Sequence, residues 1–296
     1  MRLASLARSA ALVAAVGLLA ACGQQASLGS SGASAPPVAS GTFEPGTTMA
    51  KLKDAGTVRV GTKFDQPLFG LKGLDGKPIG FDVEIAKIIS AKIGVPADKI
   101  TYTETPSKIR EDVIVNNQVD MVVATYTIND ARKQKVSFGG PYYVAGQDLM
   151  VKSDNTTITG PDSLKAANAR VCSVSGSTPA KNIEKYVDPA NIVLFDVYSK
   201  CADALRNGQV EAVTTDNVIL LGLIDSSQGA FKLIGKPFTQ EPYGIGITKG
   251  DTKFCQFIND TLKQSVSDGS YAAAWKATAG KVQPEVPTLP PADACS

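Results

Sequence analysis

Short apolar stretches of the chain alternate with segments that have the apolar periodicity of a helix. Residues 57–62 are rich in β-branched side chains, which predicts a strand, and residues 81–93 repeat apolar side chains at helical spacing. A strand over 100–105, a helix over 108–117 and a strand over 120–124 continue the alternation. This order predicts an α/β fold whose sheet is mostly parallel, with helices on its faces.

A second set of alternating elements follows a long extended stretch over residues 142–151. We expect three strands and two helices in it, over 170–174, 192–195 and 212–214, and over 179–186 and 200–207. Three further elements return the chain to the first set: an extended segment over 245–248 and helices over 252–267 and 271–276. The chain therefore crosses twice between two lobes, and such a protein binds its ligand in the cleft between them.

The folded part is expected to begin near residue 49, after a signal and a tether. Residues 1–22 carry Arg2 and Arg8 before an apolar stretch, which is typical of a secretory signal, and the ending Leu19-Ala20-Ala21-Cys22 resembles a bacterial lipobox. We therefore expect Cys22 to be lipidated and to anchor the protein at the extracellular face of the cytoplasmic membrane. An ordinary cleaved signal with an incidental cysteine is the alternative. Residues 23–48 are mostly Gly, Ser, Ala and Pro, which predicts a flexible tether.

The folded part is expected to consist of two lobes and a tail. The first lobe takes residues 49–145 and 243–280, the second takes 146–242, and a Pro-rich C-terminal tail takes 281–296. This organisation requires two crossings of the hinge.

The charge and the side-chain inventory restrict the class of function. Thirty basic and 28 acidic side chains leave a formal charge of +2, too balanced for a nucleic-acid groove or a polybasic membrane patch. The chain has no histidine, which removes the commonest general base and most catalytic zinc sites. We therefore expect a small-molecule partner, no nucleic acid, no cofactor or metal, and no enzymatic activity.

Four cysteines remain when Cys22 is set aside: Cys172, Cys201, Cys255 and Cys295. An even number in an exported chain indicates two disulfides, for which three pairings exist. We predict that Cys172 pairs with Cys201, joining a strand to a nearby helix within one lobe, and that Cys255 pairs with Cys295, holding the tail on the body. A four-cysteine metal site is the alternative, but the spacings contain no C-x-x-C.

Four stretches carry motifs in a fixed order: Val60-Gly61-Thr62-Lys63, Gly80-Phe81-Asp82-Val83-Glu84-Ile85-Ala86, Val119-Asp120-Met121-Val122-Val123-Ala124-Thr125-Tyr126-Thr127-Ile128 with Arg132, and Pro141-Tyr142-Tyr143. They resemble the family 3 extracellular solute-binding proteins, the amino-acid receptors of ABC importers, from about residue 51 to residue 279. Within the family the chain is most similar to the glutamate and glutamine binding lipoproteins of Gram-positive bacteria. The resemblance implies a two-lobed periplasmic-binding-protein-like fold with two crossover strands and an interlobe ligand cleft.

The resemblance also implies roles for residues that bind a free amino acid. Arg132 matches the arginine that binds the α-carboxylate, with Thr125 and Thr127 adding hydrogen bonds, and a guanidinium suits a carboxylate bidentately. A solvated helix residue is the alternative role of Arg132. Asp216 matches the partner of the α-ammonium, although it could also cap the helix that follows it. Thr178 matches a carboxylate-binding threonine in a small-residue turn that opens a helix.

Further residues bear on the side chain of the ligand. Lys63 lies where acidic-amino-acid receptors of the family tend to carry a base. Ser107 and Arg110 form a Ser-x-x-Arg spacing that resembles the glutamate and aspartate receptors. Tyr198 lies at a second-lobe position that often touches the ligand in relatives. Besides Arg132, these positions imply two further cations, Lys63 and Arg110, that would face the distal group of the ligand.

The charges of these residues favour an anionic ligand. Lys63, Arg110 and Arg132 carry three positive charges against the negative charge of Asp216, so a neutral ligand would leave two buried cations without partners. We therefore expect glutamate or aspartate. The alternative is that Lys63 and Arg110 pair with nearby acids, which would leave a site for glutamine or asparagine. The candidate acids are Asp65, Glu104 and Glu111.

An import receptor is the function that the resemblance implies. The ligand would dock on the first lobe, the second lobe would close over it, and an ABC permease in the membrane would engage the closed monomer. A sensor that presents its closed form to a membrane signalling protein would have the same sequence features. The fold also hosts some enzymes, for example dehydratases and lytic transglycosylases, but Asp216 and Glu104, the candidate acids for catalysis, have other expected roles.

Overall fold

The structure is a computed structural model, and it describes residues 36–296. The expected signal and the predicted lipidation residue Cys22 lie outside these described residues. Within residues 36–296, no helix has both the length and the apolar character needed to span a bilayer.

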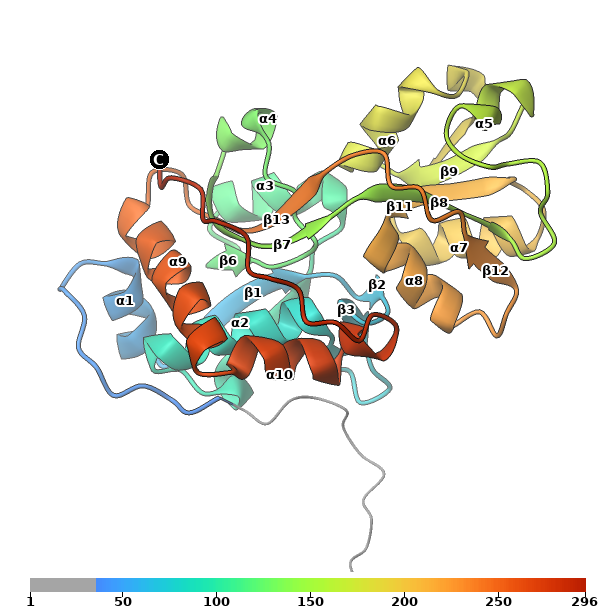
Figure 1. Ribbon diagram of the computed structural model, residues 1–296. Coiled ribbons are helices and arrows are strands. Elements are labelled where there is room, and N and C mark those ends of the chain that lie inside the picture. The colour runs from blue at the N-terminus through green and yellow to red at the C-terminus, as the bar shows by residue number, and fades with distance from the viewer. Residues whose placement is uncertain (1–35) are drawn as a thin grey trace, which may run out of the picture. The chain divides into compact units, whose positions relative to one another are not determined.

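The first lobe is built on a five-stranded sheet with the order β5-β1-β6-β13-β7 (Figure 1). Its strands are β1 (Val58–Thr62), β5 (Ile100–Glu104), β6 (Met121–Val122), β7 (Ser137–Ala145) and β13 (Glu241–Ile247). Its helices are α1 (Thr48–Ala55), α2 (Phe81–Ile93), α3 (Arg110–Val115), α4 (Asp130–Lys133), α9 (Thr252–Ser267) and α10 (Ser270–Ala277). Along β6 and just beyond it, Met121 and Val123 belong to one apolar cluster while Val122 and Ala124 belong to another, because alternate residues of an extended chain point to opposite faces. Helices therefore pack on both faces of this sheet.

The second lobe has its own five-stranded sheet, with the order β10-β9-β11-β8-β12. Its strands are β8 (Gln147–Lys152), β9 (Val171–Val174), β10 (Ile192–Phe195), β11 (Ala212–Asp216) and β12 (Phe231–Leu233). Its helices are α5 (Ser163–Ala166), α6 (Thr178–Asn182), α7 (Tyr198–Arg206) and α8 (Asn217–Asp225). A small third sheet of β2 (Asp65–Gln66), β3 (Gly70–Lys72) and β4 (Pro78–Ile79) extends from the first lobe and contacts α7 and α8 of the second.

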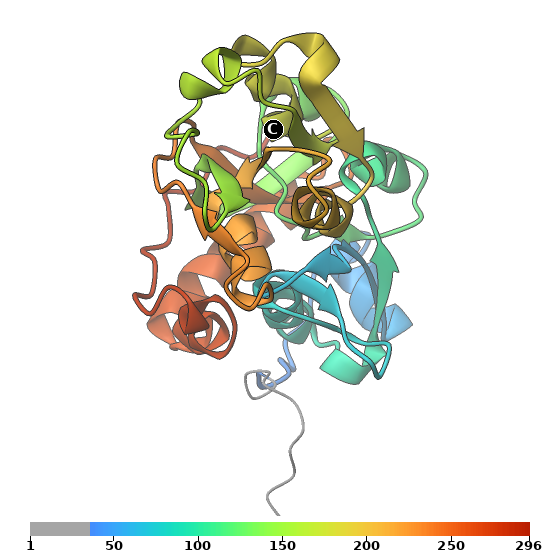
Figure 2. The ribbon, with the colours of Figure 1, turned by 90° about the vertical axis from the view of Figure 1, so that its right-hand side faces the viewer.

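Two strands connect the lobes, as expected. The chain leaves the first lobe where β7 ends and β8 begins at residue 147, and it returns along β13. β7 and β13 are antiparallel neighbours from the Glu241–Ala145 pair to the Ile247–Ser137 pair. Figure 1 shows these two strands running side by side between the lobes, and Figure 2 shows the same ribbon from the side. The two-lobed α/β fold with two crossover strands is therefore confirmed.

The expectation of mostly parallel sheets is wrong. In the first sheet β1 pairs in parallel with β5 and β6, but β13 pairs antiparallel with β6 and β7. The second sheet repeats this division, with β9 parallel to β10 and β11, and β8 antiparallel to β11 and β12. The returning crossover strand β13 enters the first sheet antiparallel to β6. The apolar periodicity of a segment does not reveal the direction in which its strand pairs, so the sequence could not predict this topology.

An aromatic cluster joins the first lobe to the crossover strands. Trp275 of α10 is fully buried, stacks on Tyr143 of β7 with ring centroids 5.2 Å apart, and contacts Phe81 of α2 edge-on at 5.0 Å. Its indole Nε1 donates a hydrogen bond of 2.9 Å to the carbonyl oxygen of Gln283, in the C-terminal tail. One side chain thus packs together a helix, a crossover strand and the tail.

The predicted flexible tether over residues 23–48 is wrong for its last part, because residues 36–47 pack on the first lobe. The amide of Ala39 donates to the carbonyl oxygen of Ala91 at 2.8 Å, and Phe43 contacts Phe257 edge-on at 5.5 Å. The folded part begins before the expected residue 49, because Phe43 supplies an apolar anchor in a segment whose composition is otherwise that of a linker.

The two predicted disulfides are both confirmed. Cys172 and Cys201 join β9 to α7 with Cα atoms 5.5 Å apart. Cys255 and Cys295 join α9 to the C-terminal tail with Cα atoms 5.7 Å apart. The tail is also held by an ion pair of 3.0 Å between Lys133 and Asp293.

We predict that the double variant Cys255→Ser, Cys295→Ser is destabilised. The bond closes a loop with a sequence separation of 40 residues, which corresponds to about 4 kcal/mol in the chain-entropy model. Urea unfolding of the double variant, compared with the parent protein under oxidising conditions, measures the loss. An unfolding free energy equal to that of the parent would contradict a stabilising role of the bond.

Candidate functional site

The residues predicted to bind a ligand converge between the lobes. Seven of the nine line one small cavity of about 10 Å³: Ser107, Arg110, Thr125, Thr127, Thr178, Tyr198 and Asp216. The other two, Lys63 and Arg132, reach the same residues through hydrogen bonds to Ser107 and to the carbonyl of Thr127. A cavity of this volume has room for about one water molecule, so the lobes are closed and an amino acid can enter only when they separate.

Arg132 is held from both lobes. The side chain of Asn129 caps α4 by accepting from the amide of Arg132 at 2.9 Å, which fixes the start of this short helix. The guanidinium donates to the carbonyl oxygen of Thr127 at 2.7 Å and, across the interface, to that of Gly176 at 3.1 Å. Its Nε lies 3.2 Å from a carboxylate oxygen of Glu111. Arg132 is only 7% exposed, so the alternative of a solvated helix residue is wrong.

Arg110 is a second buried guanidinium, only 2% exposed. It donates to the carbonyl oxygens of Ala124 and Thr125 at 2.8 and 3.2 Å, and its Nε has no hydrogen-bond partner among the described residues. Tyr126 lies under both guanidiniums, with its ring centroid 4.3 Å from the Cζ of Arg110 and 5.0 Å from that of Arg132. The aromatic face offsets part of the repulsion between the two cations. Tyr126 is a site residue that the sequence analysis did not select.

Lys63 follows β1 and is 3% exposed. Its ammonium donates to the Ser107 hydroxyl at 2.9 Å. Burial and the neighbouring positive charge of Arg110 lower its pKa from 10.5 to about 7. Within residues 36–296, neither Lys63 nor Arg110 forms an ion pair.

The acids considered as internal partners of Lys63 and Arg110 either interact with other groups or are exposed. Asp65 accepts a hydrogen bond of 2.7 Å from the backbone amide of Tyr198, across the interface between the lobes. Glu111 pairs with Arg132, and Glu104 is exposed. The structure thus does not show the pairing that was the basis for a neutral ligand.

Asp216 ends β11 and is 3% exposed. Its Oδ2 accepts a hydrogen bond of 2.6 Å from the hydroxyl of Tyr243, on the crossover strand β13, whereas its Oδ1 has no partner among the described residues. The side chain makes no capping bond to α8, so the alternative role as a side-chain cap is wrong. Burial and the charge of Glu241 raise its pKa from 3.8 to about 7. A buried carboxylate with one free oxygen suits an ammonium ligand.

Thr178 begins α6, and its hydroxyl donates to a carboxylate oxygen of Glu241 at 2.6 Å. The hydroxyl also lies 3.3 Å from that of Thr127, in the other lobe. Glu241 begins β13, is 2% exposed, and accepts from the side chains of Thr239 and Asn182 as well. The sequence analysis missed Glu241, because a lone acid before a strand has no distinguishing spacing.

Asp82 is a second acid that the sequence analysis missed as a site residue, although it lies in one of the quoted motifs. It is fully buried, and its two carboxylate oxygens accept from the amide of Thr125 and the hydroxyl of Tyr142, both at 2.7 Å. Thr125 has a φ of 46°, a conformation that is uncommon for a threonine. Burial raises the pKa of Asp82 from 3.8 to about 7. Asp82 thus holds the backbone that presents the Thr125 carbonyl to Arg110.

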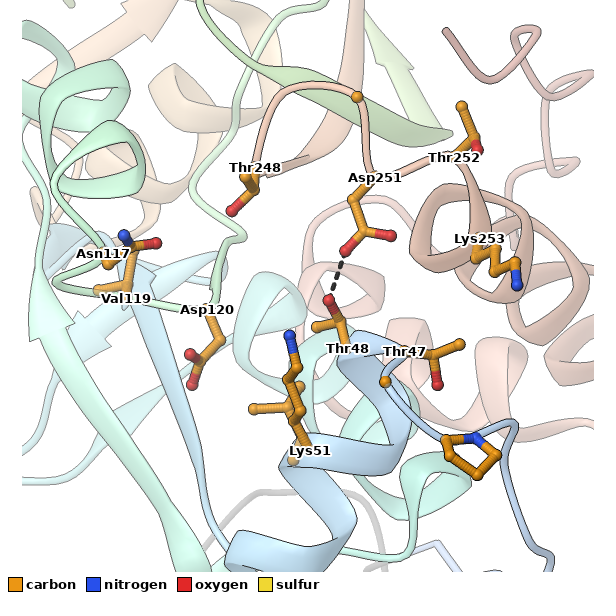
Figure 3. A pocket seen from close by; sticks show the side chains of 14 residues that line it. Thr47, Thr48, Lys51, Asn117, Val119, Asp120, Thr248, Asp251, Thr252 and Lys253 are labelled. Carbon is orange, nitrogen blue, oxygen red and sulfur yellow. Dashed lines mark hydrogen bonds between the residues drawn. The ribbon is translucent and has the colours of Figure 1, made fainter.

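A larger pocket, of about 730 Å³, lies elsewhere in the first lobe and contains none of the predicted ligand residues. Figure 3 shows it between the starts of α1 and α9, where the Thr48 hydroxyl donates to Asp251. Asp120, which also lines it, already pairs with Arg59. The pocket has the larger volume, but the buried cations and the unpaired carboxylate oxygen lie at the small cavity between the lobes.

The chain is similar to known bacterial solute-binding proteins in sequence and in structure. The family model of bacterial extracellular solute-binding proteins, family 3, matches residues 58–277. The glutamate-binding protein GluB of Corynebacterium efficiens is 39% identical over 242 residues, which cover 79% of this chain and 82% of the relative. The ABC transporter glutamine-binding protein GlnH of Bacillus subtilis is 40% identical over 230 residues, covering 77% and 83%. A solved ancestral arginine-binding protein bound to glutamine is 34% identical, with a TM-score of 0.69 over 75% of this chain and 96% of that one.

We predict that the unliganded protein is least stable near pH 7. Between about pH 4 and pH 7, folded Asp82 and Asp216 keep protons that the unfolded chain releases, so stability falls as pH rises. Between about pH 7 and pH 10, folded Lys63 has lost a proton that the unfolded chain keeps, so stability rises. Urea unfolding from pH 5 to pH 9 measures both limbs.

Two variants distinguish the acid limb from the alkaline limb of the dependence of stability on pH. Asp216→Asn should make the acid limb less steep without removing it, because Asp82 still titrates there, and Lys63→Met should flatten the alkaline limb. A stability that rises steadily from pH 5 to pH 7 would show that these carboxyl groups are not protonated in the closed protein.

Proposed function

The chain belongs to the bacterial extracellular solute-binding proteins of family 3, and we propose that it is a receptor for an acidic amino acid, glutamate or aspartate. The observation that carries the proposal is the burial of Lys63 and Arg110 without an ion pair within the described chain. Buried cations without a counter-ion are costly, and a dicarboxylate supplies the missing charge.

The amino-acid end of the ligand would lie between Arg132 and Asp216. Separation of the lobes breaks the bond from Arg132 to the Gly176 carbonyl, which frees a guanidinium edge for the α-carboxylate. Thr125 and Thr127 line the cavity beside it. The free Oδ1 of Asp216 would accept from the α-ammonium while Tyr243 continues to hold Oδ2.

The distal carboxylate would lie toward Lys63, Ser107 and Arg110. The Arg110 Nε and the Gln66 side-chain Nε2 are buried donors without partners in residues 36–296. Gln66 is placed by its own carbonyl oxygen, which accepts from the Thr125 hydroxyl at 3.0 Å. A cluster of donors that lacks acceptors favours a carboxylate over an amide, whose NH₂ group would face donors.

Closure of the lobes is the proposed mechanism. The ligand would bind the first lobe through its cations, and the second lobe would then bring Asp216 and Thr178 over it. We further propose that Cys22 is lipidated and tethers the receptor to the membrane, where an ABC permease engages the closed form. No catalytic step is assigned, because Asp82, Asp216 and Glu241 are each held as acceptors by hydroxyl groups.

A calorimetric panel with glutamate, aspartate, glutamine, asparagine and lysine tests the ligand class. We predict micromolar or tighter binding of a dicarboxylate, about 8 kcal/mol or more. Arg132→Ala should weaken it roughly 30-fold or more, because truncating one partner of a buried charge pair costs about 2–5 kcal/mol. Lys63→Ala should weaken binding of the dicarboxylates more than binding of the amides.

Arg59→Ala is the matched control, since Arg59 pairs with Asp120 at an exposed position outside the cavity and its loss should leave affinity unchanged. Preference for glutamine over glutamate at neutral pH would contradict the acidic ligand. Binding of none of the five amino acids would contradict the receptor.

The dependence on closure has its own test. Gly222 of α8 faces Pro67 of the first lobe, and a Cβ at Gly222 would lie 2.4 Å from the Pro67 carbonyl oxygen. We predict that Gly222→Ala weakens ligand binding roughly tenfold or more, since backbone cannot yield as a side chain does and overpacking costs about 1–3 kcal/mol.

Thermal unfolding of the unliganded variant provides the second readout. Alanine is a better helix former than glycine by about 1 kcal/mol, so Gly222→Ala should not destabilise an opened protein. Gly160→Ala is the control in the second lobe, where the added Cβ meets only the Lys236 side chain at 3.9 Å. Unchanged affinity in Gly222→Ala would show that this closed contact is not needed for binding.

A further inference from the structure

Lys63 has an unusual position for a cation that recognises a ligand. Its ammonium is buried, and its one hydrogen bond among the described residues goes to the neutral hydroxyl of Ser107, which lines the cavity between the lobes. An ammonium has three donors, so two of them lack partners in residues 36–296. Lys63 therefore depends on the ligand for its remaining interactions.

The charged groups that face Lys63 come from four elements. Arg110 of α3 and Arg132 of α4 oppose its positive charge, whereas Asp65 of β2 and Asp82 of α2 favour it. Both acids already accept other hydrogen bonds, Asp65 from the Tyr198 amide and Asp82 from Thr125 and Tyr142. Burial and the two guanidiniums outweigh them, and they lower the pKa of Lys63 to about 7.

We propose that Lys63 gives the site a pH-dependent preference between glutamate and glutamine, with glutamate favoured when its amine is charged and glutamine gaining when the amine is neutral. This inference rests on the proposed function. The charged ammonium has donors only and suits the distal carboxylate of glutamate. The neutral amine has a lone pair as well, so it can accept from the amide NH₂ of glutamine.

The same geometry couples glutamate binding to a proton. A carboxylate placed beside Lys63 favours its charged form. Above pH 7 the unliganded amine has lost its proton, so each glutamate that binds takes up a proton at Lys63 from the solvent. The amide of glutamine brings no charge and requires no such uptake at Lys63.

Comparing the two ligands separates the distal end of the site from the end that would bind the α-ammonium. Asp82 and Asp216 also have pKa values raised to about 7. Glutamate and glutamine share the α-ammonium that Asp216 would face, so protonation of Asp216 changes both affinities alike. Asp82 faces Lys63 instead, and the Lys63→Arg variant, in which Asp82 still titrates, measures any effect of Asp82 on the ratio. The ratio of the two dissociation constants then measures how the distal end of the site distinguishes a carboxylate from an amide.

The test is isothermal titration of the purified protein with glutamate and with glutamine at pH 6.0, 7.0, 8.0 and 8.5, each in two buffers of different ionisation enthalpy. The preference for glutamate should fall above pH 7 and approach a roughly tenfold loss for each further pH unit, as expected for one proton. Glutamate should take up more protons than glutamine at pH 8, and the difference should approach one proton.

Lys63→Arg is the matched variant, because an arginine keeps its charge over this whole range. It should bind glutamate with a preference that does not change between pH 6.0 and pH 8.5. If Lys63→Arg does not fold, the difference in proton uptake by the parent protein still decides. An unchanged ratio, or equal proton uptake by the two ligands at pH 8, overturns the inference while leaving the receptor intact. Failure to bind either ligand overturns the proposed function itself.

Discussion

The burial of three cations between two lobes is the constraint on which the rest of the site depends. Lys63, Arg110 and Arg132 are each less than a tenth exposed, and isolated charges removed from water would be costly. The protein satisfies them mainly with backbone carbonyl oxygens, one hydroxyl, the face of Tyr126 and the single carboxylate of Glu111. These partners orient the cations without neutralising them, which leaves a positive field for an anion.

The acids of the site are organised by the crossover strands. Asp82 in the first lobe accepts from Tyr142 of β7, and Asp216 in the second lobe accepts from Tyr243 of β13. The two tyrosine rings are neighbours, with centroids 6.0 Å apart. One carboxylate of each lobe is therefore hydrogen-bonded to a crossover strand. In the proposed closure, the side chains that recognise charge would also respond to the positions of the lobes.

Local sequence patterns were sufficient where apolar side chains recur at helical spacing. The helices Phe81–Ile93 and Thr252–Ser267 have the predicted bounds, because both have regular apolar spacing and α2 begins and ends at glycines. The three-stranded sheet β2-β3-β4 was not predicted, because strands of two or three residues are too short to show alternation. The tether was expected to run to residue 48, since composition does not reveal a single anchoring phenylalanine.

The candidate site was predictable in its three cations and Asp216, but not in the groups that orient them. Lys63, Arg110, Arg132 and Asp216 lie in motifs or after strands, and the structure brings them together. Arg110 and Arg132 donate to carbonyl oxygens of residues 124–127. A glutamate at the start of β13 accepts from Thr178, and an aspartate in α2 accepts from the amide of Thr125. Sequence spacing does not encode such long-range pairings. An aspartate between a strand and a helix is also ambiguous, and only the atomic contacts distinguish a ligand carboxylate from a helix cap.

The position of Trp275 makes its intrinsic fluorescence a probe of the region around the crossover strands. It is the only tryptophan in the chain, it is fully buried, and its indole stacks on a tyrosine of a crossover strand while its N–H holds the tail. Indole emission is sensitive to the polarity around the ring and to neighbouring aromatic groups. Every intrinsic fluorescence signal excited selectively through tryptophan therefore originates beside the crossover strands, and the proposed opening and closing of the lobes can be followed in real time without attaching a dye.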